Sequence, residues 1–70
     1  MLAQSIGKAI KQRRNALKIT QPNLASLAKV SVNTLYKIER GEANPTIDIL
    51  EKLANVLGLE LKLEAKKIKL

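Results

Sequence analysis

The order of apolar and polar residues along the chain predicts four helices followed by one short strand. Apolar residues recur every three or four positions over 2–18 and over 46–57, which is typical of helices with one buried face. Between them, Thr20 and Ser31 are good N-cap residues for two shorter helices, and Gly41 is placed to end the second. We expect the following apolar residues to face the core: Leu2, Ile6, Ala9, Ile10, Leu17, Leu24, Ala25, Leu27, Ala28, Leu35, Ile38, Ile47, Leu50, Leu53, Ala54 and Leu57.

The two short helices are joined by residues 29–31 alone. So short a connection makes the helices cross steeply, which is the helix-turn-helix arrangement, although an ordinary hairpin of a small bundle has the same spacing. The face of the second helix that points away from Leu35 and Ile38 favours the first interpretation. It combines hydrogen-bonding groups, a methyl-bearing surface and a cation, and it lacks the Glu–Lys pairs of a merely solvated face: Val32, Asn33, Thr34, Tyr36 and Lys37.

After Gly58 the pattern changes to a period of two, which is typical of a strand. Leucines alternate with charged residues from Leu59 to Glu64, although their helix propensity leaves a frayed helix as the alternative. This is the one stretch with a strand pattern, so its partner must come from a second copy of the chain. We therefore predict an all-α fold, a compact bundle of four main helices, with a C-terminal strand that pairs antiparallel between subunits and places Leu59, Leu61 and Leu63 in the dimer interface.

The predicted organisation is a helix-turn-helix domain over residues 1–58, a dimerisation strand over 59–65 and a basic tail over 66–70. Seventy residues give a small core, and without cysteine or histidine the chain has no disulfide or common zinc site to support it, so we expect a homodimer. No apolar run could span a membrane and no signal peptide is evident, so we expect a cytoplasmic protein with no membrane partner.

The net charge of +7 is unevenly distributed along the chain. Residues 1–38 hold seven basic residues and no acid, whereas residues 39–70 hold six of each sign. A positive field confined to one half predicts a nucleic-acid partner, the alternative being a solvated basic helix without one. We find no catalytic constellation, no metal-ligand spacing and no phosphate-binding glycine loop, so the sequence predicts neither an enzyme nor a cofactor.

Several of these residues together carry a family resemblance. The pattern TQ…LA…VS…TL..IERG…NP, from Thr20 to Pro45, resembles the Cro/C1-type (XRE-like) helix-turn-helix family, to which phage repressors belong. The resemblance covers residues 6–58 and implies a lambda repressor-like DNA-binding domain. The chain departs from the family at Asn23, where glutamate often completes a capping box, and at Lys29, where glycine is common in the turn.

The resemblance also implies which residues meet DNA. Val32, Asn33, Tyr36 and Lys37 project from the second helix of the pair, at positions that read base edges in the major groove. Four residues match positions that contact or lie near DNA phosphates in the family, and three basic residues of the first helix are further candidates. The expected contacts to the DNA backbone are therefore Gln21, Thr34, Arg40, Asn44, Lys11, Arg14 and Lys18. The family often pairs an arginine like Arg14 with the glutamate at Glu39, so Arg14 has a structural alternative. Lys11 and Lys18 have the alternative of a solvated face.

The leading functional interpretation is a sequence-specific transcriptional regulator, a repressor, that binds double-stranded DNA at a palindromic operator as a homodimer. It inserts residues 32–39 in the major groove. A narrower interpretation is an antitoxin that also binds a toxin protein, since the LGLEL segment after the last helix resembles HipB-like antitoxins. A third is an adaptor that uses the same fold to bind another protein or RNA.

Overall fold

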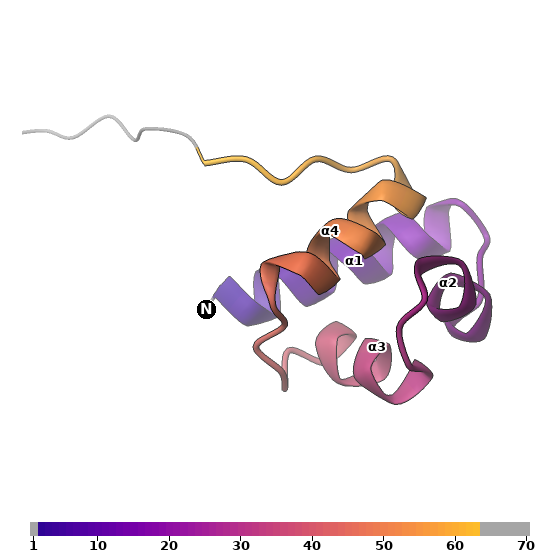
Figure 1. Ribbon diagram of the computed structural model, residues 1–70, viewed down its shortest axis with the longest axis horizontal. Helices are drawn as coiled ribbons and strands as arrows, with labels where there is room; N and C mark the ends of the chain where they lie inside the picture. The colour runs from indigo at the N-terminus through magenta and orange to yellow at the C-terminus, as the bar shows by residue number, and fades with distance from the viewer. Residues whose placement is uncertain (1, 64–70) are drawn as a thin grey trace, which may run out of the picture.

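The computed structural model describes residues 2–63, which form four helices and no strand. They are α1 (Leu2–Ala16), α2 (Gln21–Ala28), α3 (Val32–Glu39) and α4 (Ile47–Leu57). α1 packs against α3 and α4, and α2 packs against the same two helices (Figure 1). The predicted four-helix bundle is thus confirmed, while strand pairing between two subunits stays a prediction. No helix within residues 2–63 is long and apolar enough to cross a membrane.

The core is aliphatic. Its largest fully buried side chains come from α2, α3 and α4, and each contributes about 1.5–3 kcal/mol through loss of apolar surface: Leu24, Leu35, Ile38, Leu53 and Leu57. Five residues that we expected in the core are exposed instead: Leu2, Ala9, Leu17, Leu27 and Ile47. Leu2 and Ile47 lie in the first turns of α1 and α4, and Leu17 lies beyond the end of α1. Leu27 is exposed because α2 turns Leu24, Ala25 and Ala28 inward.

All four helices end in the same way. In each, a backbone N–H just past the helix donates to the carbonyl five residues earlier: Ile19 to Arg14, Val30 to Ala25, Glu42 to Lys37 and Leu59 to Ala54. The residue before each of these donors has a left-handed backbone. Gly41 and Gly58 take this conformation without strain, whereas Lys18 and Lys29, both with φ 58°, do so at a cost of about 1–2 kcal/mol. This turn also explains why α1 ends at Ala16, before the predicted Lys18.

Gly7 lies where α1 meets the end of α3. A Cβ added there would overlap the carbonyl oxygen of Ile38 and lie 3.1 Å from that of Glu39. In a free helix glycine is unfavourable by about 1 kcal/mol relative to alanine. Here the missing side chain lets the backbone of α1 touch the last turn of α3. The lower helix propensity of glycine is therefore offset by close packing of these two helices.

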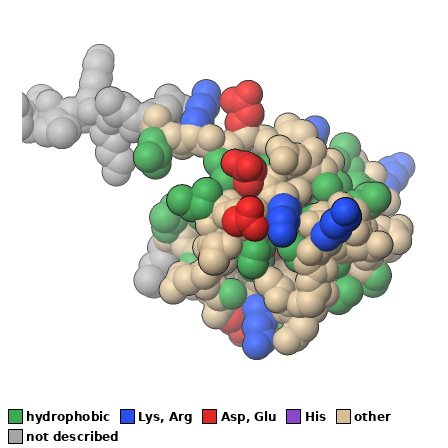
Figure 2. Space-filling view, viewed as in Figure 1, with side chains coloured by type: hydrophobic (Ala, Val, Ile, Leu, Met, Phe, Trp, Pro, Cys, Tyr) green, Lys and Arg blue, Asp and Glu red, His purple; other side chains and the backbone are tan. Residues whose placement is uncertain are grey.

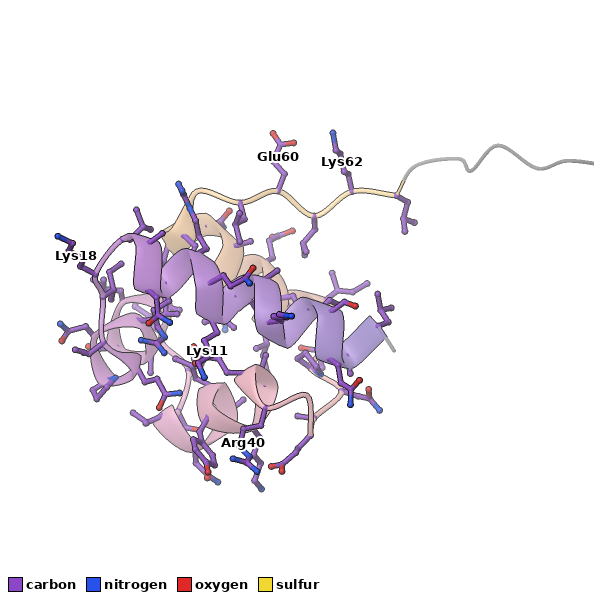
Figure 3. The ribbon with its side chains drawn as sticks, turned by 180° about the vertical axis from the view of Figure 1, so that it is seen from behind. Lys11, Lys18, Arg40, Glu60 and Lys62 are labelled. Carbon is purple, nitrogen blue, oxygen red and sulfur yellow. The ribbon has the colours of Figure 1, made fainter. Side chains whose placement is uncertain are left out.

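Residues 59–63 leave α4 and run back over the α1–α4 side of the bundle, on the side opposite α3 (Figure 1). Glu60 and Lys62 point the same way, away from the helices (Figure 3). Leu59 and Leu61 instead line a groove of about 200 Å³ with Ile6 and Leu50. Glu60 also contributes to this groove, Leu63 is fully exposed, and no strand forms within residues 59–63, so the two-sided strand stays a prediction. Residues 64 and 65 of the predicted strand, and the predicted tail 66–70, lie outside the described residues.

Candidate nucleic-acid interface

α3 presents one exposed face that begins in its first turn. Ser31 caps the helix, with its hydroxyl oxygen accepting a hydrogen bond from the Thr34 backbone N–H at 3.0 Å. Leu35 and Ile38 are buried beneath the helix. The structure places all four predicted base-contact residues on the outer face: Val32 and Tyr36, 44% and 45% exposed, together with exposed Asn33 and Lys37.

Arg40 is held at the end of this face by two neighbours. Its guanidinium lies over the Tyr36 ring, 5.4 Å from the ring centre, and its Nε donates to the Glu42 carboxylate at 3.1 Å. That hydrogen bond and the charge of Glu42 raise the pKa of Arg40 above its ordinary value. Both contacts are exposed, so they orient Arg40 more than they stabilise the fold. The sequence analysis identified neither contact. Arg40 and Glu42 lie two residues apart in a turn, which has no periodic signature, whereas Tyr36 and Arg40 have the i,i+4 spacing of helix neighbours, a signal that was present in the sequence.

Behind α3, a buried network ties three helices together. Arg14 donates from Nε and Nη2 to the two carboxylate oxygens of Glu39, at 2.7 and 3.0 Å, and from Nη1 to the Ile19 carbonyl at 2.8 Å. Gln21, the first residue of α2, donates from Nε2 to Glu39 at 2.9 Å. The hydrogen bonds from Arg14 to Glu39 raise the pKa of Arg14. The guanidinium is thus turned inward, toward α3 and away from solvent.

The other residues that we predicted to contact the DNA backbone fall into two groups. Thr34 is half-buried in the first turn of α3, and Asn44 is exposed in the connection that follows this helix. Lys11 and Lys18 are exposed residues at the middle and beyond the end of α1. Lys18 lies at the far edge of the molecule from Arg40, whereas Lys11 lies nearer to α3 in the same view (Figure 3). Thr34 and Arg40 thus lie on α3 and at its end, Gln21 bonds to its last residue, and Lys18 lies apart.

The exposed acidic residues lie on a different part of the fold from α1, α2 and α3. Across α1, α2 and α3 the single acidic residue is Glu39, and it is buried against Arg14. The exposed acids of the described chain all follow α3, and the face formed by α4 and residues 59–63 mixes acidic, basic and apolar side chains (Figure 2). A polyanion would meet exposed cations and no exposed carboxylate on α1–α3 themselves. Within residues 2–63 no three His, Cys, Asp or Glu residues cluster as metal ligands.

Comparison with known proteins agrees with this geometry. A family model described as helix-turn-helix matches residues 10–63. The chain is 40% identical over 83% of its length to Multiprotein-bridging factor 1 of Candida albicans, and 39% identical over 81% to the immunity repressor protein of Bacillus phage phi105. The crystal structure of the clp gene regulator ClgR from Corynebacterium glutamicum superposes with a TM-score of 0.81 at 27% identity, covering 84% of this chain and 63% of that one.

The likeness concerns one domain of most of these proteins. The chain spans 38% and 40% of the two sequence relatives, and 17% of an HTH-type transcriptional regulatory protein of Methanococcus vannielii that it also matches at 40% identity over 79% of its own length. What these proteins share with it is the segment that holds α2, α3 and the exposed face of α3. The chain belongs to the Cro/C1-type (XRE-like) helix-turn-helix family of DNA-binding transcriptional regulators.

Proposed function

We propose that this protein is a homodimeric repressor of transcription that binds a palindromic operator, with α3 of each subunit in the major groove. The observation that carries the proposal is the exposed face of α3. It offers an amide, a phenol, an ammonium and an aliphatic side chain from a helix whose own acid is buried. An α-helix fits the major groove, about 12 Å wide, where each base pair shows a distinct set of donors and acceptors. Immunity repressor protein is also the name of one relative.

Three of the four residues on this face have a suitable partner on a base edge. Asn33 is suited to adenine, Lys37 to guanine, and Val32 to the methyl group of thymine. Tyr36 is half-exposed beside them and carries Arg40 on its ring. Reading of bases by Asn33 and Lys37 would supply most of the discrimination between sequences, at roughly 1–3 kcal/mol for each good pairing.

The residues around α3 would hold the phosphates. Thr34 lies in the first turn of α3, Arg40 and Asn44 follow its end, Gln21 begins α2, and Lys11 adds positive charge from α1. Such contacts fix the register of a protein on the duplex and give affinity without sequence preference. We assign Arg14 to the fold instead of to DNA, because three of its N–H groups already donate to Glu39 and Ile19. Lys18, far from Arg40, would contribute through the long-range field.

The dimer would form through residues 59–63, paired antiparallel. The two-fold axis of two antiparallel strands stands perpendicular to the ribbon they form. Glu60 and Lys62 point away from the helices (Figure 3), so this axis runs from the face of the ribbon that carries Glu60 and Lys62, past the side of the bundle, toward the side where α3 lies. Rotation about it keeps both α3 helices on the same side of the dimer. Two recognition helices on one side are what a single duplex requires, with half-sites about 34 Å apart.

Selection of binding sites from a pool of random DNA, with the unmodified chain, tests the proposal. We expect enrichment of an inverted repeat whose half-sites are centred roughly 10 base pairs apart. Affinity for the enriched site should fall steeply with salt, as it does when several phosphates are neutralised. Enrichment of no sequence, with weak salt-dependent binding to all DNA, would contradict a sequence-specific repressor.

An adaptor is a second candidate, favoured by the likeness to Multiprotein-bridging factor 1, whose name describes a bridge between proteins. The same selection separates the two functions. An adaptor has no need of base readout, so it would enrich no inverted repeat. The basic, acid-free surface of α1–α3 favours the repressor. The antitoxin alternative keeps the operator and adds a toxin protein as partner.

A further inference from the structure

We infer one particular register for the strand pair, which rests on the proposed dimer. Leu61 lies on the two-fold axis, directly opposite Leu61 of the partner subunit. Residues 59–63 are where the structure and the sequence pattern together determine this register. Glu60 and Lys62 point away from the helices, Leu59 and Leu61 line the groove with part of Glu60, and in the sequence the alternation of leucine and charge continues to Glu64.

Two-fold symmetry restricts which residues can face each other. In an antiparallel pair with the axis at Leu61, Leu59 lies opposite Leu63 of the partner subunit, and Glu60 lies opposite Lys62 of the partner subunit. Every leucine then meets a leucine, and each charged residue of the segment meets the opposite charge. Directly opposite side chains are about 4.5–5.5 Å apart at Cβ, close enough for both kinds of pair to stabilise the ribbon.

Neighbouring registers lose one or both kinds of pair. An axis at Glu60 or at Lys62 places that charge against its own copy, which is destabilising. An axis at Leu63 keeps opposite charges together, because Lys62 then faces Glu64 of the partner subunit. By sequence, however, it sets Leu61 against an alanine and Leu59 against a lysine. The axis at Leu61 alone satisfies the leucines and the charges of residues 59–63 together.

The exposure of the leucines fits this register. Leu59 is half-buried and packs on the core, Leu61 is 47% exposed, and Leu63 is fully exposed. Leu59, Leu61, Ile6 and Leu50 line the groove between α1 and α4. With the axis at Leu61, the exposed Leu63 of each subunit lies beside Leu59 of the other, at the edge of this groove. The most exposed leucine thus gains an apolar neighbour, and the second copy covers the groove.

Single-cysteine variants test the register directly, since the chain has no cysteine of its own. Leu61→Cys should form a disulfide between subunits under mild oxidation without DNA, because directly opposite Cα atoms lie within the roughly 7 Å limit of a disulfide. Leu63→Cys should not, since Leu63 is displaced by about 13 Å along the ribbon from its own copy. Leu27→Cys, on the outer face of α2, is the control for chance collision. At micromolar protein the Leu61 variant should crosslink roughly a hundredfold faster than this control.

Exchange of the charges provides a second measurement. Lys62→Glu alone should weaken the dimer in sedimentation experiments, and the double variant Glu60→Lys with Lys62→Glu should restore it, because the exchanged residues again face opposite charges. With the axis at Leu63 the double variant would not be rescued, since Glu64 of the partner subunit would still face the new carboxylate.

Three results would overturn the register, and they differ in what they say of the dimer. Fast crosslinking by Leu63→Cys but not by Leu61→Cys would move the axis and leave the strand dimer standing. Crosslinking by no strand position in a protein that still sediments as a dimer would show that another surface pairs. A monomer in every variant and in the parent chain would contradict the proposed dimer itself.

Discussion

Arg14 of α1 and Glu39, the last residue of α3, form a two-point ion pair whose side chains are 11% and 2% exposed. Gln21 adds a hydrogen bond from the first turn of α2 to the same carboxylate. The pair therefore fixes how the two helices of the helix-turn-helix unit sit on α1. The orientation of α3 therefore depends on a contact that does not itself face solvent.

Breaking this pair should destabilise the protein in the absence of DNA. Glu39→Gln leaves the Arg14 charge buried without its partner, and the expected loss is about 3–5 kcal/mol of unfolding free energy. That is a large share of the roughly 4–10 kcal/mol expected for a chain of this size. Urea unfolding of Arg14→Met, Glu39→Gln and the double variant measures their coupling. The exposed pair Arg40–Glu42 is the matched control, with a coupling of at most about 1 kcal/mol. Additive effects of Arg14→Met and Glu39→Gln would show that they do not interact.

Replacing Gly7 with alanine should destabilise the protein, although alanine has the higher helix propensity. Gly7→Ala at an open helix position stabilises by about 1 kcal/mol. Here the new methyl group overlaps the Ile38 carbonyl oxygen, so α1 must move away from α3, and we expect a loss of about 1–3 kcal/mol. Thermal unfolding measures the difference, with Lys8→Ala, at an exposed position of the same helix, as the control. A more stable Gly7→Ala variant would show that α1 and α3 do not approach as described.

Replacing Lys18 or Lys29 with glycine should make the protein more stable. Both have a left-handed backbone that costs a lysine about 1–2 kcal/mol, part of which glycine loses again through its freer unfolded chain. We expect Lys18→Gly and Lys29→Gly each to raise the unfolding free energy by roughly 0.5–1 kcal/mol. Lys11→Gly, inside α1, is the opposite control and should lower it by about 1 kcal/mol. Destabilisation by all three substitutions would contradict the left-handed assignment.

The sequence predicted the four helices because their apolar spacing, N-caps and two of their terminal residues, Gly41 and Gly58, are local signals. The family resemblance identified Lys29 as standing where glycine is common in the turn, whereas nothing in the sequence indicated the left-handed Lys18, because lysine carries no turn signal. Gly7 was interpreted as a weak point of α1, since the reason for a glycine there lies on another helix, at Ile38. Spacing alone overestimated the core at Leu27 and Ile47, because which side of a helix is covered depends on its neighbours in space.

The site residues divide in the same way. The exposed face of α3 follows from helix geometry once Leu35 and Ile38 are buried, so Val32, Asn33, Tyr36 and Lys37 could be placed from the sequence. The inward direction of Arg14 and the hydrogen bond of Gln21 to Glu39 depend on three helices meeting at one carboxylate. No local pattern records such a meeting, and for Arg14 only the family resemblance indicated it.

Base reading by α3 is the central claim, and one comparison of affinities tests it most directly. Binding of the parent chain, Asn33→Ala and Lys11→Ala is measured by fluorescence anisotropy on the selected operator and on random DNA. We predict that Asn33→Ala loses roughly 1–3 kcal/mol on the operator and little on random DNA, whereas Lys11→Ala weakens both alike and flattens the salt dependence. An equal loss on operator and random DNA for Asn33→Ala would contradict the assignment of this face to base readout.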